Sequence, residues 1–229
     1  MRTLIVSDLH LGVPGRHPQA DGELCSLILR PGWDQIILLG DVFDLWSLPL
    51  RRIVKKHPTV IAILASVECP IIYVPGNHDD AFKGLAQLNT WCVSWPTYRF
   101  CSGGKWFTAV HGDEYDTFKS TASRAAAWIS RLVDRIAAWF AGPGVSITRE
   151  ARVSFVERGP GREKFVRPLH ERAVADLNCE NLLIGHTHVP DSGQDINGTW
   201  VVGTGDFGPE HMTYVVVENG KAELHTIDP

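Results

Sequence analysis

The 229-residue sequence lacks any long apolar run. Uncharged stretches such as Thr59–Val67 fall far short of the roughly 20 apolar residues that a membrane-spanning helix needs. The N-terminal segment carries Asp8 and His10 where a signal peptide would have its apolar region and cleavage site. We therefore expect a soluble, cytoplasmic protein.

Cysteine is also scarce, with five residues scattered along the chain and no C-x-x-C pair. An odd, scattered set argues against a disulfide framework and against a zinc ribbon. We expect these thiols to be small buried hydrophobic groups. Hydrophobic residues make up 44% of the chain and charged residues 21%, which excludes disorder and leaves enough apolar surface for a full core. The length fits one domain with an insertion.

Net charge is only −4, but the charges are unevenly distributed. Residues 115–180 contain half of the 22 basic residues and only 8 of the 26 acidic ones. That segment is therefore net positive, while the rest of the chain is net negative. The asymmetry predicts an acidic body that carries a basic attachment.

Short apolar runs alternate with helical patterns over the first half of the chain. Strands that are buried on both faces are expected at Arg2–Val6, Gln35–Leu39 and Pro70–Val74. Helices are expected between them, at Asp21–Leu29 and Leu48–Val67. This β-α-β-α-β order favours a parallel sheet with right-handed crossovers.

The pattern then changes to hairpins. Turn sequences occur at Ser102-Gly103-Gly104, Asn197-Gly198 and Asn219-Gly220. The C-terminal quarter is therefore expected to be mostly antiparallel. The strands expected in this half are Thr97–Cys101, Lys105–Val110, Asn181–Ile184, Thr199–Val202, Met212–Glu218 and Ala222–Ile227.

Residues 115–180 show no strand pattern. Ser123–Phe140 is predicted to be an amphipathic helix with an apolar arc rich in aromatic residues, and Gly142-Pro143-Gly144 ends it. Arg149–Arg167 is basic and loop-like, and Val166–Leu177 is predicted as a second helix. We interpret the chain as one domain, residues 1–229, with a helical basic and aromatic insertion at about 115–180.

Five short polar motifs each follow a predicted strand. They are Asp8-Leu9-His10, Gly40-Asp41, Gly76-Asn77-His78-Asp79, His111-Gly112-Asp113 and Gly185-His186-Thr187-His188. The carboxyl ends of strands line the ligand crevice of an α/β sheet, so the five segments would meet at one rim. Side chains two residues apart on an extended segment point to the same side, which suits Asp-x-His and His-x-His.

These motifs offer oxygen and nitrogen ligands and no thiolate. Such a set suits divalent Mn, Fe or Zn rather than Ca²⁺ in an all-oxygen cage. Seven of these side chains, two Asp, one Asn and four His, are candidate ligands. Seven ligands are too many for one tetrahedral metal site, but they fit two metals that share a carboxylate. Each motif alone has a plainer interpretation, because Asp41 could cap a helix and His186 and His188 could be an ordinary loop pair. Five glycine-flanked motifs in this order favour the metal site.

The motifs resemble those of the calcineurin-like metallophosphoesterases. That family carries DxH, GDxxD, GNHD, H and GHxH, and this chain has SDLH, GDVFD, GNHD, HGD and GHTH. The resemblance covers essentially the whole chain. It implies a four-layer α/β/β/α sandwich, which agrees with the parallel-then-antiparallel order of strands.

The resemblance also implies two metal sites. One metal would be held by Asp8, His10 and His188, and the other by Asn77, His111 and His186. Asp41 would bridge them. Two metals so placed clamp a phosphate and lower the pKa of a water molecule that attacks phosphorus. Mn²⁺ is the ion expected first, with Fe, Zn and Ni as alternatives.

The remaining residues of the GNHD motif receive catalytic roles from the same resemblance. His78 resembles the family's active-site histidine, which stabilises or protonates the leaving oxygen, and Asp79 would orient it. The plainer alternative for His78 is a structural residue behind the ligands.

The flanking residues narrow the resemblance further. The segment Asp41-Val42-Phe43-Asp44-Leu45-Trp46 lacks the Arg-Gly of phosphoprotein phosphatases. Together with SDLHLG and GHTHVP, it resembles the UDP-2,3-diacylglucosamine pyrophosphatases, which release UMP and a lipid phosphate in lipid A synthesis. That branch also carries a helical insertion between HGD and GHTH. The better-known enzymes of the branch have Arg in place of His78.

The insertion could serve such a substrate. The aromatic face of Ser123–Phe140, with Trp128 and Trp139, would supply a groove for acyl chains, and Arg149 and Arg152 would contact the diphosphate. The alternative is that the aromatic residues only dock the helix on the body. Contact of the insertion with the inner membrane surface is a further expectation.

Two other functions remain open from the sequence. A phosphodiesterase or nuclease of the same family would use the basic insertion to bind nucleotides or DNA. A metal-free protein-binding scaffold is the remote alternative, because such scaffolds lose ligands and this chain retains all seven. The oligomeric state cannot be inferred from the sequence.

Overall fold

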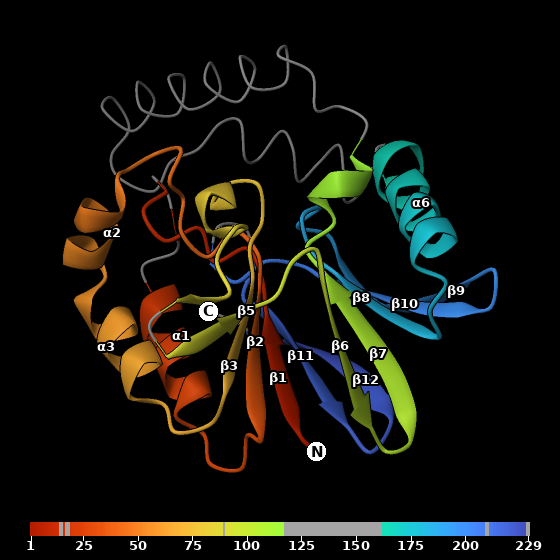
Figure 1. Cartoon of the computed structure of the whole chain (residues 1–229), viewed down its shortest axis with the longest axis horizontal. Coiled ribbons are helices and arrows are strands. Elements are labelled where there is room, and N and C mark those ends of the chain that lie inside the picture. Colours follow the sequence, from red (N-terminus) through yellow and green to blue (C-terminus); the bar gives the residue numbers. More distant parts are fainter. Residues whose placement is uncertain (14–15, 17–18, 89, 117–161, 209–210, 228–229) are drawn as a thin grey trace.

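The structure is a computed structural model that describes residues 1–13, 16, 19–88, 90–116, 162–208 and 211–227. Two β-sheets face each other, with helices on both outer faces (Figure 1). The layers are helix, sheet, sheet and helix, which confirms the predicted four-layer α/β/β/α sandwich.

The first sheet has the strand order β12-β11-β1-β2-β3-β5-β4. Its centre is parallel, because β1, β2, β3 and β5 run in one direction, and β11 and β12 extend it antiparallel. Three helices, α1, α2 and α3, belong to this side. The bounds are β1 Thr3–Val6, α1 Ala20–Ile28, β2 Gln35–Leu39, α2 Leu50–Lys56, α3 Pro58–Ser66, β3 Ile71–Val74, β4 Gln87–Leu88, β5 Trp91–Val93, β11 Thr213–Glu218 and β12 Lys221–Thr226.

The second sheet has the order β6-β7-β8-β10-β9. Its central strands β7, β8 and β10 are parallel, and β6 and β9 pair antiparallel at the two edges. Helix α6 covers its outer face (Figure 1). The bounds are β6 Thr97–Ser102, β7 Lys105–Val110, α6 Arg167–Leu177, β8 Asn181–Ile184, β9 Pro190–Ile196 and β10 Thr199–Thr204.

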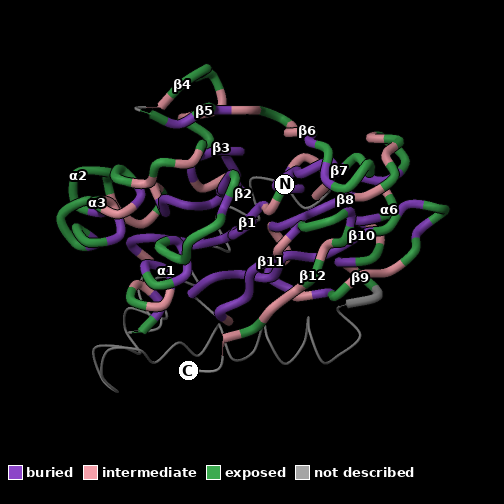
Figure 2. The backbone as a smooth tube through the Cα atoms, turned by 90° about the horizontal axis from the view of Figure 1, so that it is seen from below, coloured by how far each residue is buried: buried purple, intermediate pink, exposed green. Residues whose placement is uncertain are grey.

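Three apolar cores separate the four layers, and residue alternation along the strands divides side chains among them. In β1, Leu4 and Val6 face α1, whereas Ile5 faces the other sheet. In β8, Leu183 faces the first sheet, whereas Leu182 faces α6. The strands are therefore apolar on both faces, as the sequence predicted, and the buried residues run through the middle of the molecule (Figure 2).

The expected Leu48–Val67 helix is wrong as a single element. Pro58 lacks an N–H and cannot continue a helix, so α2 ends before His57 and α3 begins at Pro58. The strands β4, β5 and β9 were not expected. Strand β9 has the polar sequence PDSGQDI and exists because it pairs with β10. Short 3₁₀ turns occupy Asp80–Phe82 and Asp113–Tyr115.

The three predicted turns are confirmed. Gly103 and Gly104, Asn197 and Gly198, and Asn219 and Gly220 all have positive φ and connect antiparallel strands. All five cysteines are free, as expected. Only Cys25 is buried, however. Cys69 and Cys179 are half-buried, and Cys92 and Cys101 are exposed, so the prediction of burial is confirmed for Cys25 alone.

Much of the basic insertion lies outside the described residues, including the predicted Ser123–Phe140 helix. The described part begins with a π-helical turn at Arg162–Val166, which is not the expected loop and leads directly into α6. The predicted Val166–Leu177 helix is confirmed as α6. Among the helices of the described ranges, none is long and apolar enough to cross a membrane.

Candidate metal centre

The five predicted motifs follow β1, β2, β3, β7 and β8 at their carboxyl ends, where the two sheets meet. The backbone of these loops is unusual, because five site residues other than glycine have positive φ. They are Asp8, His10, Asp41, His186 and His188, with φ between 45° and 67°. Such conformations cost on the order of 1–3 kcal/mol each and persist where surrounding contacts enforce them. The loops are therefore strained at the residues that were predicted to bind metal.

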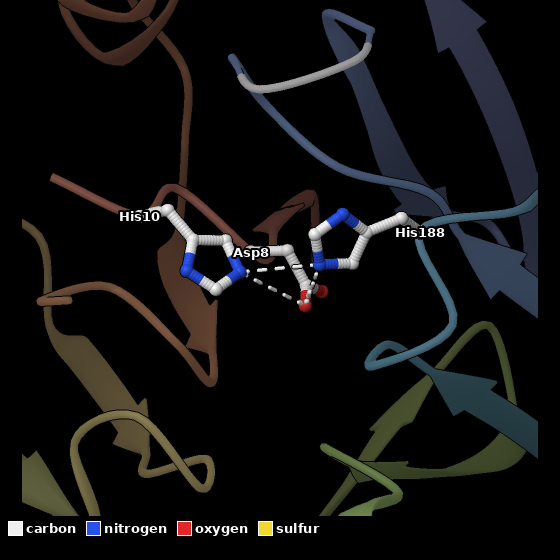
Figure 3. A group of neighbouring side chains, drawn as sticks. All are labelled: Asp8, His10 and His188. Carbon is white, nitrogen blue, oxygen red and sulfur yellow. Dashed lines mark hydrogen bonds and ion pairs between the residues drawn. The ribbon is translucent and has the colours of Figure 1, made fainter. Parts of the chain in front are cut away.

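Three of the predicted ligands converge on one point. His188 Nε2 lies 3.2 Å from Asp8 Oδ1 and 3.1 Å from His10 Nε2. All three side chains are buried, and the two histidine rings face each other across the Asp8 carboxylate (Figure 3). Their ligand atoms lie within 4.8 Å of one another, close enough to share one ion. We call Asp8, His10 and His188 the first half of the site.

Asp41 lies between His10 and His111. Its Oδ1 is 3.5 Å from His111 Nε2, and its Oδ2 is 3.7 Å from His10 Nε2. Asp41 also forms a group of possible ligands with Asp8 and His111. Each carboxylate oxygen thus faces a different histidine. This placement is compatible with the predicted bridging role.

We call the residues predicted to hold the other metal, Asn77, His111 and His186, the second half of the site. Of these, His111 belongs to a group of possible ligands with Asp8 and Asp41. His111 Nδ1 lies 3.1 Å from the Leu39 carbonyl, which only accepts, so Nδ1 carries a hydrogen and Nε2 is left to ligate. His186 Nε2 lies 3.2 Å from the Asp116 carboxylate, so Nδ1 is the atom that would ligate a metal. The rings of His111 and His186 are 5.3 Å apart. A ligating histidine commonly donates its other nitrogen in this way.

Two glycines allow the loops to approach closely. A Cβ at Gly76 would lie 2.2 Å from Asp41 Oδ1 and 2.6 Å from His111 Nε2. A Cβ at Gly40 would lie 2.1 Å from His111 Nδ1, and Gly40 also has a φ of +81°. Both contacts are shorter than real Cβ atoms show, so any larger residue would displace ligands. The absence of a side chain at Gly40 and Gly76 therefore lets the loops of Asp41 and His111 pack together.

Burial and neighbouring charges both shift the pKa values of the site residues. Burial alone would raise the pKa of Asp41, but His111 and His78 hold that pKa well below its usual range. Burial, together with the charge of His78, lowers the pKa of His10 to about 3, so His10 offers a neutral nitrogen at pH 7. Burial would lower the pKa of His111, but the Asp41 carboxylate raises it well above the usual value. A metal ion bound there displaces that proton.

The residues of the site fit divalent metal ions. Asp8 Oδ1 and Asn77 Oδ1 are buried, and neither accepts a hydrogen bond among the described residues, although His188 Nε2 forms an ion-pair contact with Asp8 Oδ1 at 3.2 Å. A buried oxygen without a partner costs free energy that a bound cation recovers. The donors around these atoms are carboxylate, amide and imidazole, which suit first-row divalent ions.

His78 lies beside the ligands and is held by two neighbours. Its Nδ1 is 2.8 Å from Asp44 Oδ1, and its ring stacks on Trp46 with centroids 4.0 Å apart. Its Nε2 faces the ligands, at 3.9 Å from Asp41 Oδ2. The contact with His78 lowers the pKa of Asp44 to about 2, against the opposing effect of burial. Asp44 therefore stays ionised and fixes the ring.

The predicted role of Asp79 as the orienting carboxylate needs correction. Its oxygens accept from the backbone N–H groups of Gly76 and Val42, at 2.6 and 2.7 Å, and from the Tyr73 hydroxyl. Burial and the charge of Asp41 raise the pKa of Asp79 to about 6. Asp79 thus ties together the loops after β2 and β3, and Asp44 is the carboxylate that pairs with His78.

Sequence reasoning assigned no role to Asp44, Trp46 or Asp116. The signal for Asp44 was present, because it is the last residue of the GDVFD motif. Asp116 belongs to no motif and reaches His186 only through the fold. The predicted substrate residues Trp128, Trp139, Arg149 and Arg152 lie outside the described residues.

Comparisons with known proteins identify the family. The family model for calcineurin-like phosphoesterases matches residues 1–190. The chain is 24% identical to UDP-2,3-diacylglucosamine hydrolase from Shewanella piezotolerans, over 90% of each chain. It is 25% identical to the protein of the same name from Shewanella pealeana, over 96% of each. Among solved structures, Vps29 from Chaetomium thermophilum shares the fold, with 11% identity over 99% of this chain and 96% of that one and a TM-score of 0.50.

Proposed function

The chain belongs to the calcineurin-like phosphoesterase family, and from this premise we propose that it hydrolyses a sugar-nucleotide lipid diphosphate. Membership makes it a metal-dependent phosphoesterase. The proposed substrate resembles UDP-2,3-diacylglucosamine, and the products are UMP and an acylated sugar phosphate. In that role the enzyme is a pyrophosphatase of lipid A biosynthesis.

One observation carries the choice of substrate. Two relatives named for UDP-2,3-diacylglucosamine hydrolysis align with 90% and 96% of this chain, rather than with the metal motifs alone. The alignment therefore includes the inserted segment between the HGD and GHTH motifs. The identity of 24–25% supports a related substrate class and leaves the acyl groups open.

Two metal ions would be held as the resemblance predicts. The first half of the site with Asp41 would hold one ion, and the second half with Asp41 would hold the other. When bound, such ions polarise the phosphate and activate water for attack on phosphorus. Mn²⁺ is the proposed ion, with Fe, Zn and Ni as alternatives, because ligands of this kind bind several first-row metals.

His78 acts on the leaving group in this proposal. Asp44 accepts from Nδ1, so Nε2 is the atom available to the substrate. A hydrogen at Nε2 donates to the oxygen on which negative charge develops. The ionised Asp44 stabilises the positive ring, and Trp46 packs on its exposed face. Asp79 supports the loop without contacting the reacting atoms.

The insertion is proposed to bind the rest of the substrate. Trp128 and Trp139 would contact acyl chains, and Arg149 and Arg152 would neutralise the diphosphate. A lipid substrate also favours peripheral contact with the inner face of a membrane on the cytoplasmic side. Both assignments rest on the sequence.

A phosphodiesterase or nuclease is the second candidate, and His78 is the observation that favours it. The better-known lipid A pyrophosphatases carry Arg at this position, whereas the general phosphodiesterase motif is GNHD. A phosphodiester in a nucleic acid has a poor leaving group, for which a proton donor matters more than for a diphosphate.

UMP release from UDP-2,3-diacylglucosamine tests the proposal. The purified protein is assayed with Mn²⁺, with chelator, and beside a generic phosphodiester. We expect chelator-sensitive release with kcat/KM of roughly 10⁴ M⁻¹s⁻¹ or more. Hydrolysis of the generic ester alone would overturn the substrate and leave the phosphoesterase site, and a panel of nucleotides and DNA would then identify the alternative. Asp41→Asn serves as the control for a contaminating hydrolase.

A further inference from the structure

Arg16 is a buried cation that the reaction does not use. Its side chain is 4% exposed, and it lies in the loop that follows the Asp8-Leu9-His10 motif. Its Nη1 donates to the Leu9 carbonyl and, at 2.7 Å, to the Phe207 carbonyl. A buried charge that donates to backbone carbonyls holds those carbonyls in place.

The position of Leu9 makes the contact important. Leu9 lies between Asp8 and His10, both of which have positive φ, so the Leu9 carbonyl belongs to a strained segment. The opposite side of the segment is also held, because Phe207 N donates to the Ser7 carbonyl at 3.1 Å. Arg16 thus joins the two loops that enclose the strained segment.

The surrounding chain is built around the guanidinium. Gly208 has a φ of +134°, and a Cβ there would lie 1.9 Å from Arg16 Nη1. On the other side, Arg16 Nε is 3.0 Å from Asp21 Oδ1, and Asp21 Oδ2 is 2.5 Å from His57 Nδ1. The buried Asp206 carboxylate adds a favourable charge nearby. The chain from His57 through Asp21 to Arg16 therefore anchors the metal loop to the helical layer.

Stability alone is a weak reason for such an arrangement. Burying a guanidinium costs desolvation energy, and apolar replacements of buried ion pairs are often neutral or stabilising. We propose that Arg16 is a positioning residue that holds Asp8 and His10 in metal-binding geometry and so sets the affinity of the first half of the site. The inference rests on the proposed metal ligands and is independent of the substrate.

Calorimetric titration of metal-free protein with Mn²⁺ tests this role. Two backgrounds separate the sites, because Asn77→Ala leaves the first half intact and His188→Ala leaves the second. We expect Arg16→Met to raise the Kd for Mn²⁺ about 10–100-fold in the Asn77→Ala background, as the loss of other outer-shell partners does. In the His188→Ala background, the Kd is expected to stay unchanged.

Thermal unfolding of the metal-free protein separates positioning from stability. We expect Arg16→Met to lower the unfolding midpoint without metal, because it leaves the Leu9 and Phe207 carbonyls and Asp21 without this donor. A loss of global stability alone would weaken both metal sites alike. Arg30→Met is the matched control, because Arg30 also joins a helix end to the first sheet, through Tyr214, without touching the metal loop. Equal loss of affinity in both backgrounds, or unchanged affinity in both, would overturn the inference.

A conservative variant, Arg16→Lys, keeps the proposal testable if Arg16→Met does not fold. Lysine offers a point charge in place of a planar fork, so Arg16→Lys should weaken Mn²⁺ binding in the same background, to a smaller extent. Full affinity in Arg16→Lys would overturn the role of the two-carbonyl contact. Wild-type protein that binds no Mn²⁺ would overturn the metal assignment as well, whereas Mn²⁺ binding without UMP release would overturn the proposed substrate alone.

Discussion

In the first half of the site, the ligands converge on one another, whereas in the second half each histidine is held from outside. His10 and His188 meet across Asp8, and the strained backbone brings them there. Instead, His111 contacts the Leu39 carbonyl, and His186 contacts the Asp116 carboxylate. The ligands of the first half therefore contact one another directly, in a loop whose backbone Arg16 holds. The second half depends on partners that no metal motif includes.

A variant of Asp41 is expected to have the largest effect, because Asp41 is predicted to bind metal in both halves of the site. We expect Asp41→Asn to remove tight binding of both ions and to reduce turnover by more than the roughly 10–100-fold that loss of an outer-shell partner costs. Metal content after dialysis against Mn²⁺ and turnover of a generic phosphodiester measure the two effects. Asp34→Asn is the control for loss of one carboxylate, because the Asp34 side chain is exposed. A variant that keeps two ions and near-wild-type turnover would refute the bridging role.

Single-ligand variants compare the halves directly. His111→Ala should lower turnover by orders of magnitude while the far-UV circular dichroism spectrum stays native, because it removes one ligand at a strand end. Since the first half is already converged, His188→Ala should abolish the tighter of two Mn²⁺ binding steps, and His111→Ala the weaker. Calorimetric titration of each variant measures this order. Near-wild-type turnover of His111→Ala at saturating Mn²⁺ would contradict its assignment.

His78 belongs to neither half. A variant of His78 tests whether this residue binds metal or acts on the leaving group. His78→Gln should bind both ions normally but lower turnover of an alkyl phosphodiester by roughly 10²–10⁴-fold, the usual contribution of a general acid. A diphosphate substrate should be affected far less, because its leaving group is already stable as an anion. Steady-state kinetics on the two substrates measure the ratio.

Variants of the neighbouring carboxylates provide the control for His78. Asp44→Asn should reproduce the substrate dependence of His78→Gln at smaller magnitude, because Asp44 orients the ring. Asp79→Asn should affect both substrates alike, because Asp79 supports the backbone of two loops. Substrate dependence in Asp79→Asn would restore the role that the sequence assigned to it.

The sequence predicted the apolar strands well, because they depend on local patterns, and the three residues that it assigned to one metal lie together in the structure. Gln35–Leu39 and Asn181–Ile184 match their predicted bounds, since buried strands have near-continuous apolar sequences. The carboxylate that contacts His78 shows the limit of prediction from sequence, because it is Asp44 and not the predicted Asp79. Neighbours in sequence can point in opposite directions at a turn, so adjacency to His78 did not decide which carboxylate contacts its ring. Strand β9 and the contact of Asp116 with His186 arise only from long-range pairing.

Asp116 gives the smallest and most specific test of the difference between the halves. Its carboxylate fixes His186 with Nδ1 free for metal, so Asp116→Ala should weaken Mn²⁺ binding to the second half by about tenfold, at the low end for such partners. Asp116→Asn should restore much of the affinity, because its amide oxygen still accepts from Nε2. The Asn77→Ala background reports the first half, where neither variant should change the Kd. If Asp116→Ala weakened the first half instead, the carboxylate would act through the Asp8 loop, and the two halves would not be built independently.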